Sequence, residues 1–428
     1  MPLFFNFYKQ QILYFFMTIP SNNSGYIQQA IPDLPDLYDT SPKAKKESDN
    51  ITEMLANILN EQMNPNKQMN SSIKKPLKER VDCNIQDEEG CTPLIQAAFE
   101  NNVSSVKSLL LEGAKIELQN NAGDTALHFA VYHQNLELAE SLLESPSKKD
   151  FIDLADKNGR TALHLATLSQ NLDFVNLLLE NDANVNLSDK EGITPLFIAY
   201  QQSNFEIFKK LLIKSNRDTV DRFYLEDPKN QKRVTLLFSA AVRGKIKFVS
   251  ALVKRGANVN KLNESFQMTP FMAACSQGNV NLVKRFLAKD SKNEWLSCLG
   301  ECERKALNYT IDSGNPQVVE MLLKAGANIM DHQYLGYTPL MQAVINGNKE
   351  IVETILNYDR DYQCLNYQLM GKTALEMAHI RKTESKDAKK TLNYQQIIQV
   401  LTKAQANYVA SLPSNNLQHP SNNYGLLN

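Results

Sequence analysis

The chain has 428 residues, with 46 Lys and Arg residues against 47 Asp and Glu residues, so its formal net charge is −1. Hydrophobic residues make up 43% of the chain and charged residues 22%, which are ordinary values for a globular protein. This composition excludes collagen, a fully disordered chain, a polytopic membrane protein and a small disulfide-stabilised scaffold, and the charge balance gives no sign of a general nucleic-acid binder.

Residues 1–19 are apolar and aromatic, but polar residues from Asn6 to Gln11 interrupt them. The uninterrupted stretch that follows is too short to span a bilayer. A secretory signal is a poor fit as well, because the segment lacks a basic start and a small-residue cleavage site. Two interpretations stay open: weak membrane contact through residues 1–19, or a natural start at Met17 that leaves residues 1–16 outside the native protein.

Residues 20–47 are rich in Pro, Ser, Asn and Lys without periodicity, a composition typical of disorder. A helical signal follows at residues 50–63, where Asn50 can cap a helix and apolar residues share one face. This helix either covers the start of the next region or docks a partner. We therefore predict a mostly disordered region over residues 1–80 with one short helix near 50–63.

From residue 81 onward the sequence repeats itself. The segment Gly90-Cys-Thr-Pro-Leu94 is the first of nine similar copies, some of them degenerate, at steps of 33 to 41 residues. The positions equivalent to its threonine are 92, 125, 161, 194, 235, 269, 305, 338 and 373. This pattern resembles ankyrin repeats, which have a period of about 33 residues and a Thr-Pro-Leu-His signature.

The resemblance implies an all-α solenoid over residues 81–404, built from about nine stacked helix-turn-helix repeats with projecting β-hairpin loops. A flexible tail is expected over residues 405–428. Within a repeat, the threonine can cap a first helix and a following proline, as at Pro93, fits its first position. Paired apolar residues such as Val318 and Val319 predict the buried side of a second helix. No repeat can bury its apolar face alone, so stacking must supply the core.

Two departures from the family pattern concern its histidine and its threonine. The histidine is present only as His128 and His164, whose equivalent positions favour a structural role over a metal pair. Lys305 replaces the threonine in the seventh repeat, which makes that repeat the least regular.

No catalytic motif is evident. The chain contains no phosphate-binding loop, zinc-protease motif or nucleophile elbow, and the pair Cys298 and Cys302 has no partner pair with zinc-ligand spacing. We therefore expect no cofactor, no metal and no small-molecule substrate. The alternative is an enzyme with an unrecognised active centre, for which the repeats would present the substrate. Cys275 is a candidate nucleophile in that case, although it falls on a small interior position of its repeat.

A binding function is better sought on the concave face that the first helices of ankyrin repeats form. Large apolar residues recur there in the first four repeats, and if stacking aligns them they form an apolar stripe that suits protein binding. The alternative is that they pack between adjacent first helices. The predicted partner-binding residues of this stripe are Phe99, Phe129, Tyr132, Leu165, Leu168 and Ile198.

Two insertions, residues 214–232 and 291–303, fall on the hairpin-loop side of the repeats. Trp295, the only tryptophan, is either a partner-binding residue of the second insertion or is tucked under its own loop.

These features predict a monomeric, non-catalytic scaffold that binds another protein through the concave face and hairpin tips and does not bind nucleic acid. Six sparse cysteines favour a reducing, cytoplasmic location. The Asn-, Lys- and Gln-rich tails also resemble those of proteins from AT-rich protists, or those of ankyrin-containing effectors of intracellular bacteria. In that case the protein is secreted into a host cell and its target is a host protein.

Overall fold

The computed structural model describes residues 82–227, 232–264, 267–289, 294–298, 300, 304–332 and 336–411. It divides into two compact units, with the boundary between Thr219 and Val220. The predictions for residues 1–19 and for a helix near 50–63 lie outside the described residues, as does most of the predicted tail.

Unit 1 contains four helix pairs among its described residues, each pair beginning at one of the first four repeat threonines. The first helices are short and the second helices follow after a tight turn. The first helices are α4 (Pro93–Phe99), α6 (Ala126–Tyr132), α9 (Ala162–Leu168) and α11 (Pro195–Gln201), and the second helices are α5 (Val103–Leu111), α7 (Leu136–Leu143), α10 (Leu172–Glu180) and α12 (Phe205–Lys214). Two single-turn helices, α8 (Lys148–Phe151) and α13 (Arg217–Val220), lie in connections.

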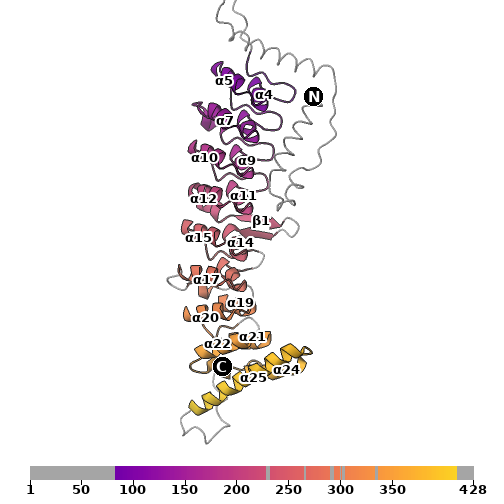
Figure 1. Ribbon diagram of the computed structural model, residues 1–428, viewed down its shortest axis with the longest axis vertical. Coiled ribbons are helices and arrows are strands. Elements are labelled where there is room, and N and C mark those ends of the chain that lie inside the picture. Colours follow the sequence, from indigo (N-terminus) through magenta and orange to yellow (C-terminus); the bar gives the residue numbers. More distant parts are fainter. Residues whose placement is uncertain are drawn as a thin grey trace, which may run out of the picture. The chain divides into compact units, whose positions relative to one another are not determined.

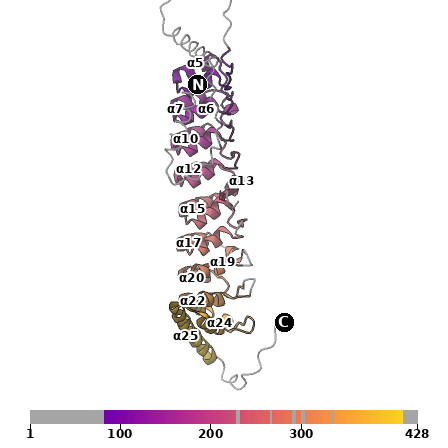
Figure 2. The ribbon, with the colours of Figure 1, turned by 90° about the vertical axis from the view of Figure 1, so that its right-hand side faces the viewer.

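The pairs of unit 1 stack in two layers (Figures 1 and 2). First helices pack on first helices, in the order α4, α6, α9 and α11, and second helices pack in the order α5, α7, α10 and α12. The core lies between the layers, where second-helix side chains such as Phe174, Val175 and Leu178 are fully buried. The all-α repeat architecture predicted from the spacing is therefore confirmed.

Threonine capping begins most first helices, as expected. The side-chain oxygen of Thr92 accepts a hydrogen bond from the backbone N–H of Ile95 at 3.2 Å, and Thr194, Thr235, Thr269 and Thr338 make the same contact. Each of these residues has an extended backbone conformation, which ends the preceding loop and starts the helix.

Consecutive loops of unit 1 contact each other through backbone hydrogen bonds. The N–H of Asn121 donates to the carbonyl of Glu89 at 2.8 Å, and the N–H of Lys157 donates to that of Ala122 at 2.8 Å. A glycine makes this approach possible. Gly123 has a φ of +81°, and a Cβ atom there would lie 2.8 Å from the backbone nitrogen of Lys157.

Unit 2 begins with a β-hairpin and continues with five helix pairs among its described residues. Strands β1 (Phe223–Asp227) and β2 (Lys232–Thr235) pair antiparallel, with an irregularity between Leu225 and Asp227. The first helices are α14 (Leu236–Val242), α16 (Pro270–Ser276), α19 (Ala306–Ser313), α21 (Pro339–Asn346) and α24 (Ala374–Glu384). The second helices are α15 (Ile246–Arg255), α17 (Val280–Leu287), α20 (Pro316–Lys324), α22 (Lys349–Tyr358) and α25 (Ala388–Ser411), and the single-turn helices α18 (Glu294–Ser297) and α23 (Gln363–Asn366) lie between pairs.

The helices of unit 2 also form two packed layers, and the irregular seventh repeat takes its place in them. The first helices pack in the order α14, α16, α19, α21 and α24, and the second helices in the order α15, α17, α20, α22 and α25. In the seventh repeat Asn308 assists the start of α19, because its Oδ1 atom accepts a hydrogen bond from the N–H of Lys305 at 3.0 Å. The lost threonine therefore does not disrupt the stack.

Of the two alternatives for Trp295, the structure favours the buried one over a partner-binding role at the surface. Its indole, on α18, is 8% exposed and packs against Phe271 of α16 and Phe286 of α17, with ring centroids 6.0 and 5.5 Å apart. Helix α18 therefore packs onto its own unit, and its tryptophan fills the core because burying so large an apolar surface is favourable.

The last helix continues past residue 404, where the solenoid was predicted to end and a flexible tail to begin. Helix α25 runs without a break to Ser411, and Tyr394, Ile397 and Leu401 bury its inner side. Because Gln405 to Ser411 continue the hydrogen-bonding pattern of a helix that is already anchored, extending it costs little. Among the described residues, no helix is both long and apolar enough to cross a membrane.

The loop contact at Gly123 can be tested against a matched glycine. Gly123 and Gly192 have nearly the same φ, +81° and +80°, but a Cβ atom at Gly192 would meet nothing within 4 Å. We expect Gly192→Ala to cost about 1 kcal/mol from backbone strain alone, and Gly123→Ala to cost about 1–3 kcal/mol more because it also displaces the next loop.

The measurement is the urea midpoint of unfolding, followed by circular dichroism. Equal midpoints for Gly123→Ala and Gly192→Ala would show that the contact between loops contributes nothing to stability.

Candidate functional site

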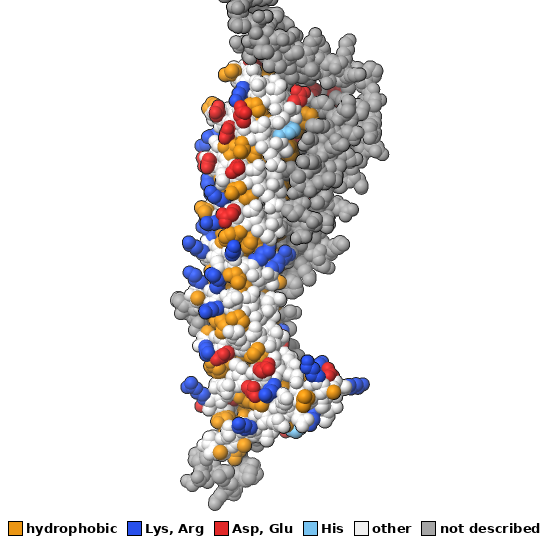
Figure 3. Space-filling view, viewed as in Figure 1, with side chains coloured by type: hydrophobic (Ala, Val, Ile, Leu, Met, Phe, Trp, Pro, Cys, Tyr) orange, Lys and Arg blue, Asp and Glu red, His pale blue; other side chains and the backbone are white. Residues whose placement is uncertain are grey.

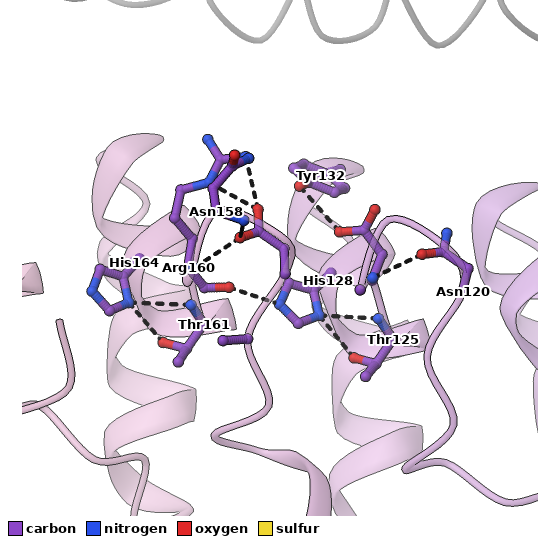
Figure 4. A network of polar contacts seen from close by, with 12 residues as sticks. Asn120, Thr125, His128, Tyr132, Asn158, Arg160, Thr161 and His164 are labelled. Carbon is purple, nitrogen blue, oxygen red and sulfur yellow. Dashed lines mark hydrogen bonds and ion pairs between the residues drawn. The ribbon is translucent and has the colours of Figure 1, made fainter. Parts of the chain in front are cut away.

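Two histidines link neighbouring repeats of unit 1 (Figure 4). Nδ1 of His128 accepts from the N–H of Thr125 at 3.1 Å and lies 2.9 Å from its hydroxyl oxygen, while Nε2 lies 3.1 Å from the carbonyl oxygen of Arg160 in the next repeat. His164 repeats the arrangement with Thr161 and the carbonyl of Ile193. A carbonyl can only accept, so Nε2 carries the proton in both rings. The structural role predicted for these histidines is confirmed.

Burial lowers the pKa of His164 to about 4. The imidazole is completely buried, and its Nδ1 atom already faces two donors from Thr161. A second proton on Nδ1 would therefore have to displace an N–H donor, and it would leave a charged ring buried away from solvent. His164 is neutral in the folded protein at physiological pH.

This lowered pKa makes the stability of unit 1 depend on pH. A histidine in the unfolded chain titrates near pH 6.5, so the unfolded state binds the extra proton first as the pH falls. The stabilisation by neutral His164 is complete above pH 6.5 and is lost progressively down to about pH 4. The expected loss is on the order of 3 kcal/mol.

The control is His164→Asn, because Asn308 shows that an asparagine accepts the same backbone hydrogen bond in the seventh repeat. We expect the melting temperature of the wild type to fall more between pH 7.5 and pH 5 than that of the variant. Parallel falls in the two proteins would assign the pH dependence to other groups.

Acceptor side chains organise the loops that lead into the first helices. Asp156 is buried, and its Oδ1 atom accepts from the N–H groups of Asn158 and Arg160, both at 2.8 Å. Its Oδ2 atom pairs with the Arg160 guanidinium at 2.8 Å. Asn120 and Asp189 accept the equivalent backbone bonds in their repeats. Sequence reasoning overlooked this set, although an Asp or Asn three residues before the loop glycine was visible as a recurring signal.

The exposed side of the first helices in unit 1 carries an aromatic cluster. We call the first-helix face the surface formed by the residues at 99, 132, 168 and 201, which are all half-buried. Phe99 contacts Phe129 edge-on, with ring centroids 5.5 Å apart, and Phe129 contacts Tyr132 at 5.9 Å. The Tyr132 hydroxyl lies 3.4 Å from a carboxylate oxygen of Asp124. The rings are therefore held in place by contacts on both sides.

The predicted apolar stripe is only partly exposed. Phe99, Tyr132 and Leu168 are half-buried and reach the surface of the first-helix face. The expected exposure is wrong for the other three residues, because they lie one turn earlier, where the side chain points toward a neighbouring first helix. Phe129 is 3% exposed, Leu165 1% and Ile198 5%.

The corresponding side of unit 2 is polar. Asp312 pairs with Arg304 and accepts hydrogen bonds from Gln342 at 2.5 Å and from Asn346 at 3.0 Å. The Arg304 guanidinium also lies over the ring of Tyr309, 4.3 Å from its centroid. These residues come from α19, α21 and the loop before α19, and they contact one another within the face.

Cys275 does not have the environment of a catalytic nucleophile. Its side chain is completely buried, and burial raises the pKa of its thiol to about 12. The thiolate that would attack a substrate is therefore scarce at neutral pH. Within the described ranges, no group of three or more His, Cys, Asp or Glu side chains is arranged to hold a metal ion.

Comparison with known proteins places these repeats in a family. The family model described as ankyrin repeats matches residues 61–153, 148–222, 213–297, 236–333 and 307–408. The chain is 27% identical over 167 residues to the human transient receptor potential cation channel subfamily A member 1, covering 39% of this chain and 14% of the channel. It is 33% identical over 116 residues to an ankyrin repeat protein of Variola virus, covering 27% of this chain and 19% of that protein.

A solved structure is also similar. The ankyrin repeat domain of Bcl-3 aligns with a TM-score of 0.46 and 22% identity, covering 55% of this chain and 99% of that domain. The matched repeats cover only 14% of the human channel and 19% of the Variola virus protein. The activities of those whole proteins therefore do not transfer to this chain with the repeats.

Proposed function

Because this chain belongs to the ankyrin-repeat family, we propose that it is a non-catalytic module that binds a partner protein through the first-helix face of unit 1. The observation that carries the proposal is the aromatic cluster of Phe99, Phe129 and Tyr132, whose outer rings are half-buried rather than enclosed. Aromatic side chains held in place by their neighbours are typical anchors of protein interfaces.

The cluster is suited to binding without rearrangement. Nε2 of His133 lies 2.7 Å from the carbonyl oxygen of Phe99, so α6 is attached to the end of α4 beside the exposed rings. Leu168 extends the apolar surface on the next first helix, and its carbonyl accepts from Gln202 at 2.8 Å. A preformed surface of this kind loses little side-chain entropy when a partner binds.

Unit 2 supplies a different kind of surface in this proposal. Asp312 already pairs with Arg304 and with Gln342, so removing water from these polar side chains would gain little. In the proposed complex these side chains contribute peripheral polar contacts to the partner, whereas the apolar anchors lie in unit 1. Cytoplasmic action as a monomer accords with the sparse cysteines, and delivery into a host cell remains the alternative site of action.

The proposal is tested by replacing the two exposed rings. Phe99→Ser with Tyr132→Ser removes the anchors, and we expect it to weaken binding of a captured partner about tenfold or more, because anchor residues contribute more than 1 kcal/mol each. The measurement is affinity capture with quantitative mass spectrometry, comparing each variant with the wild type.

The matched control is Leu111→Ser with Ile213→Ser, which removes two side chains of unit 1 that are 88% and 64% exposed on the second helices. Tyr132→Phe is the conservative variant, since it keeps the ring and loses only the contact with Asp124. If the double serine variant folds and captures the same partners as the control, binding does not use the first-helix face.

A further inference from the structure

Unit 2 contains a strongly basic stretch, although the net charge of the whole chain is close to zero. Residues 232–289 contain eleven Lys and Arg residues and one acidic residue, Glu264. The formal charge of this stretch is therefore +10, against −1 for the whole chain. A charge excess confined to two repeats is a local surface property, and the average composition could not reveal it.

Five of these basic residues lie on the second helices α15 and α17, and Lys289 follows the end of α17. Each helix buries one apolar side, with Phe248, Val249 and Leu252 on α15 and equivalent residues on α17. The side of each helix opposite its buried residues is exposed to solvent (Figure 3). We call the basic face the exposed set Lys247, Lys254, Arg255, Lys284, Arg285 and Lys289.

The basic face is continuous across two repeats. Helices α15 and α17 pack against each other. A guanidinium nitrogen of Arg285 on α17 also donates to the hydroxyl of Ser250 on α15 at 3.2 Å. Charges from both helices therefore lie on one surface.

The lysines of the basic face are not neutralised by their neighbours. Further along unit 2, Lys324 pairs with Glu320 at 2.7 Å and Lys349 pairs with Glu353 at 3.3 Å. Within the described residues, Lys247, Lys254, Lys284 and Lys289 form no such pair. Mutual repulsion among them is therefore left uncompensated in the folded unit.

Helix stability alone does not explain this arrangement. Lys254 and Arg255 lie in the last turn of α15, where a positive charge interacts well with the helix dipole. Lys284 and Arg285 lie in the last turn of α17 in the same way. Lys247, however, lies in the first turn of α15, where the dipole disfavours a positive charge, so it shares only exposure and charge with the others.

We propose that the basic face of α15 and α17 binds an acidic segment of a partner protein. This inference rests on the proposed function and adds a second contact to it, one that depends on charge. Complementary charge speeds association and selects partners, so a band of unpaired lysines fits a segment rich in Asp and Glu.

Its limited extent favours a short acidic segment over a long polyanion. On one side α17 packs against α20, and α20 against α22, where Glu320, Glu350 and Glu353 bring negative charge to the outer helices. A nucleic acid that ran beyond the two basic helices would meet these carboxylates. Among the described residues, α15 and α17 also expose no large apolar or aromatic side chain that could enter a bilayer or stack on a base.

The test uses a fluorescent glutamate-rich peptide and the full chain. The variant Lys247→Glu, Lys254→Glu, Lys284→Glu reverses the basic face. The control Lys149→Glu, Lys157→Glu, Lys190→Glu reverses three exposed lysines of unit 1 and changes the net charge by the same amount. Binding is measured by fluorescence anisotropy at about 50 mM and about 150 mM salt, because screening weakens such contacts.

We expect the basic-face variant to bind the peptide at least about tenfold more weakly than the wild type, and the control variant to differ by less than about threefold. Equal losses in both variants would overturn the proposal, since they would report net charge alone. Tighter binding of duplex DNA or of phosphatidylserine vesicles than of the peptide would overturn it in favour of another anionic target. A salt-sensitive dimer of the chain by itself in light scattering would overturn it in favour of self-association.

The peptide assay separates this inference from the proposed function. The variant Phe99→Ser with Tyr132→Ser keeps every residue of the basic face, so it should bind the peptide as the wild type does. Failure of that variant to lose captured partners would contradict the proposed function and leave the peptide result intact.

Discussion

Stacking between successive repeats is the interaction on which each unit depends. A helix pair alone would leave one apolar side of its second helix in water, and residues such as Phe174 and Leu178 are buried only because neighbouring pairs cover them. The close approach of consecutive loops follows from the same constraint. It requires glycine at positions such as Gly123, because the backbone of the next repeat occupies the space that a side chain would need. In the first three repeats the Gly-x-Thr pattern therefore marks a contact between repeats as well as the start of a helix.

The polar contacts between repeats fix the orientation of one repeat relative to the next. His128 and His164 each connect the cap of one helix to a carbonyl of the following repeat, and buried Asp156 fixes the loop between them. Repeats without the histidine still form, as the seventh does with Asn308. Apolar burial thus supplies most of the stability, while these hydrogen bonds fix how one repeat is set against the next.

The two units offer surfaces of different chemistry. The first-helix face of unit 1 presents rings that are already packed against one another, whereas the basic face of unit 2 presents charges that repel one another. The first kind of surface gains from excluding water and the second from meeting opposite charge. A scaffold with both can combine an apolar anchor with selectivity for an acidic partner.

The sequence by itself determined the repeat, its helix pairs and the threonines that begin them, because these depend on local spacing and on residues that recur in every repeat. It did not determine which members of a stripe reach the surface. Phe129 and Tyr132 lie one turn apart on the same helix, and only the packing of α4 against α6 buries the first and leaves the second half-exposed. Tertiary structure likewise decided that Trp295 packs against Phe271 and Phe286, and that lysines from two separate helices form one face. Burial and clustering depend on neighbours that are distant in the chain, and no local pattern specifies them.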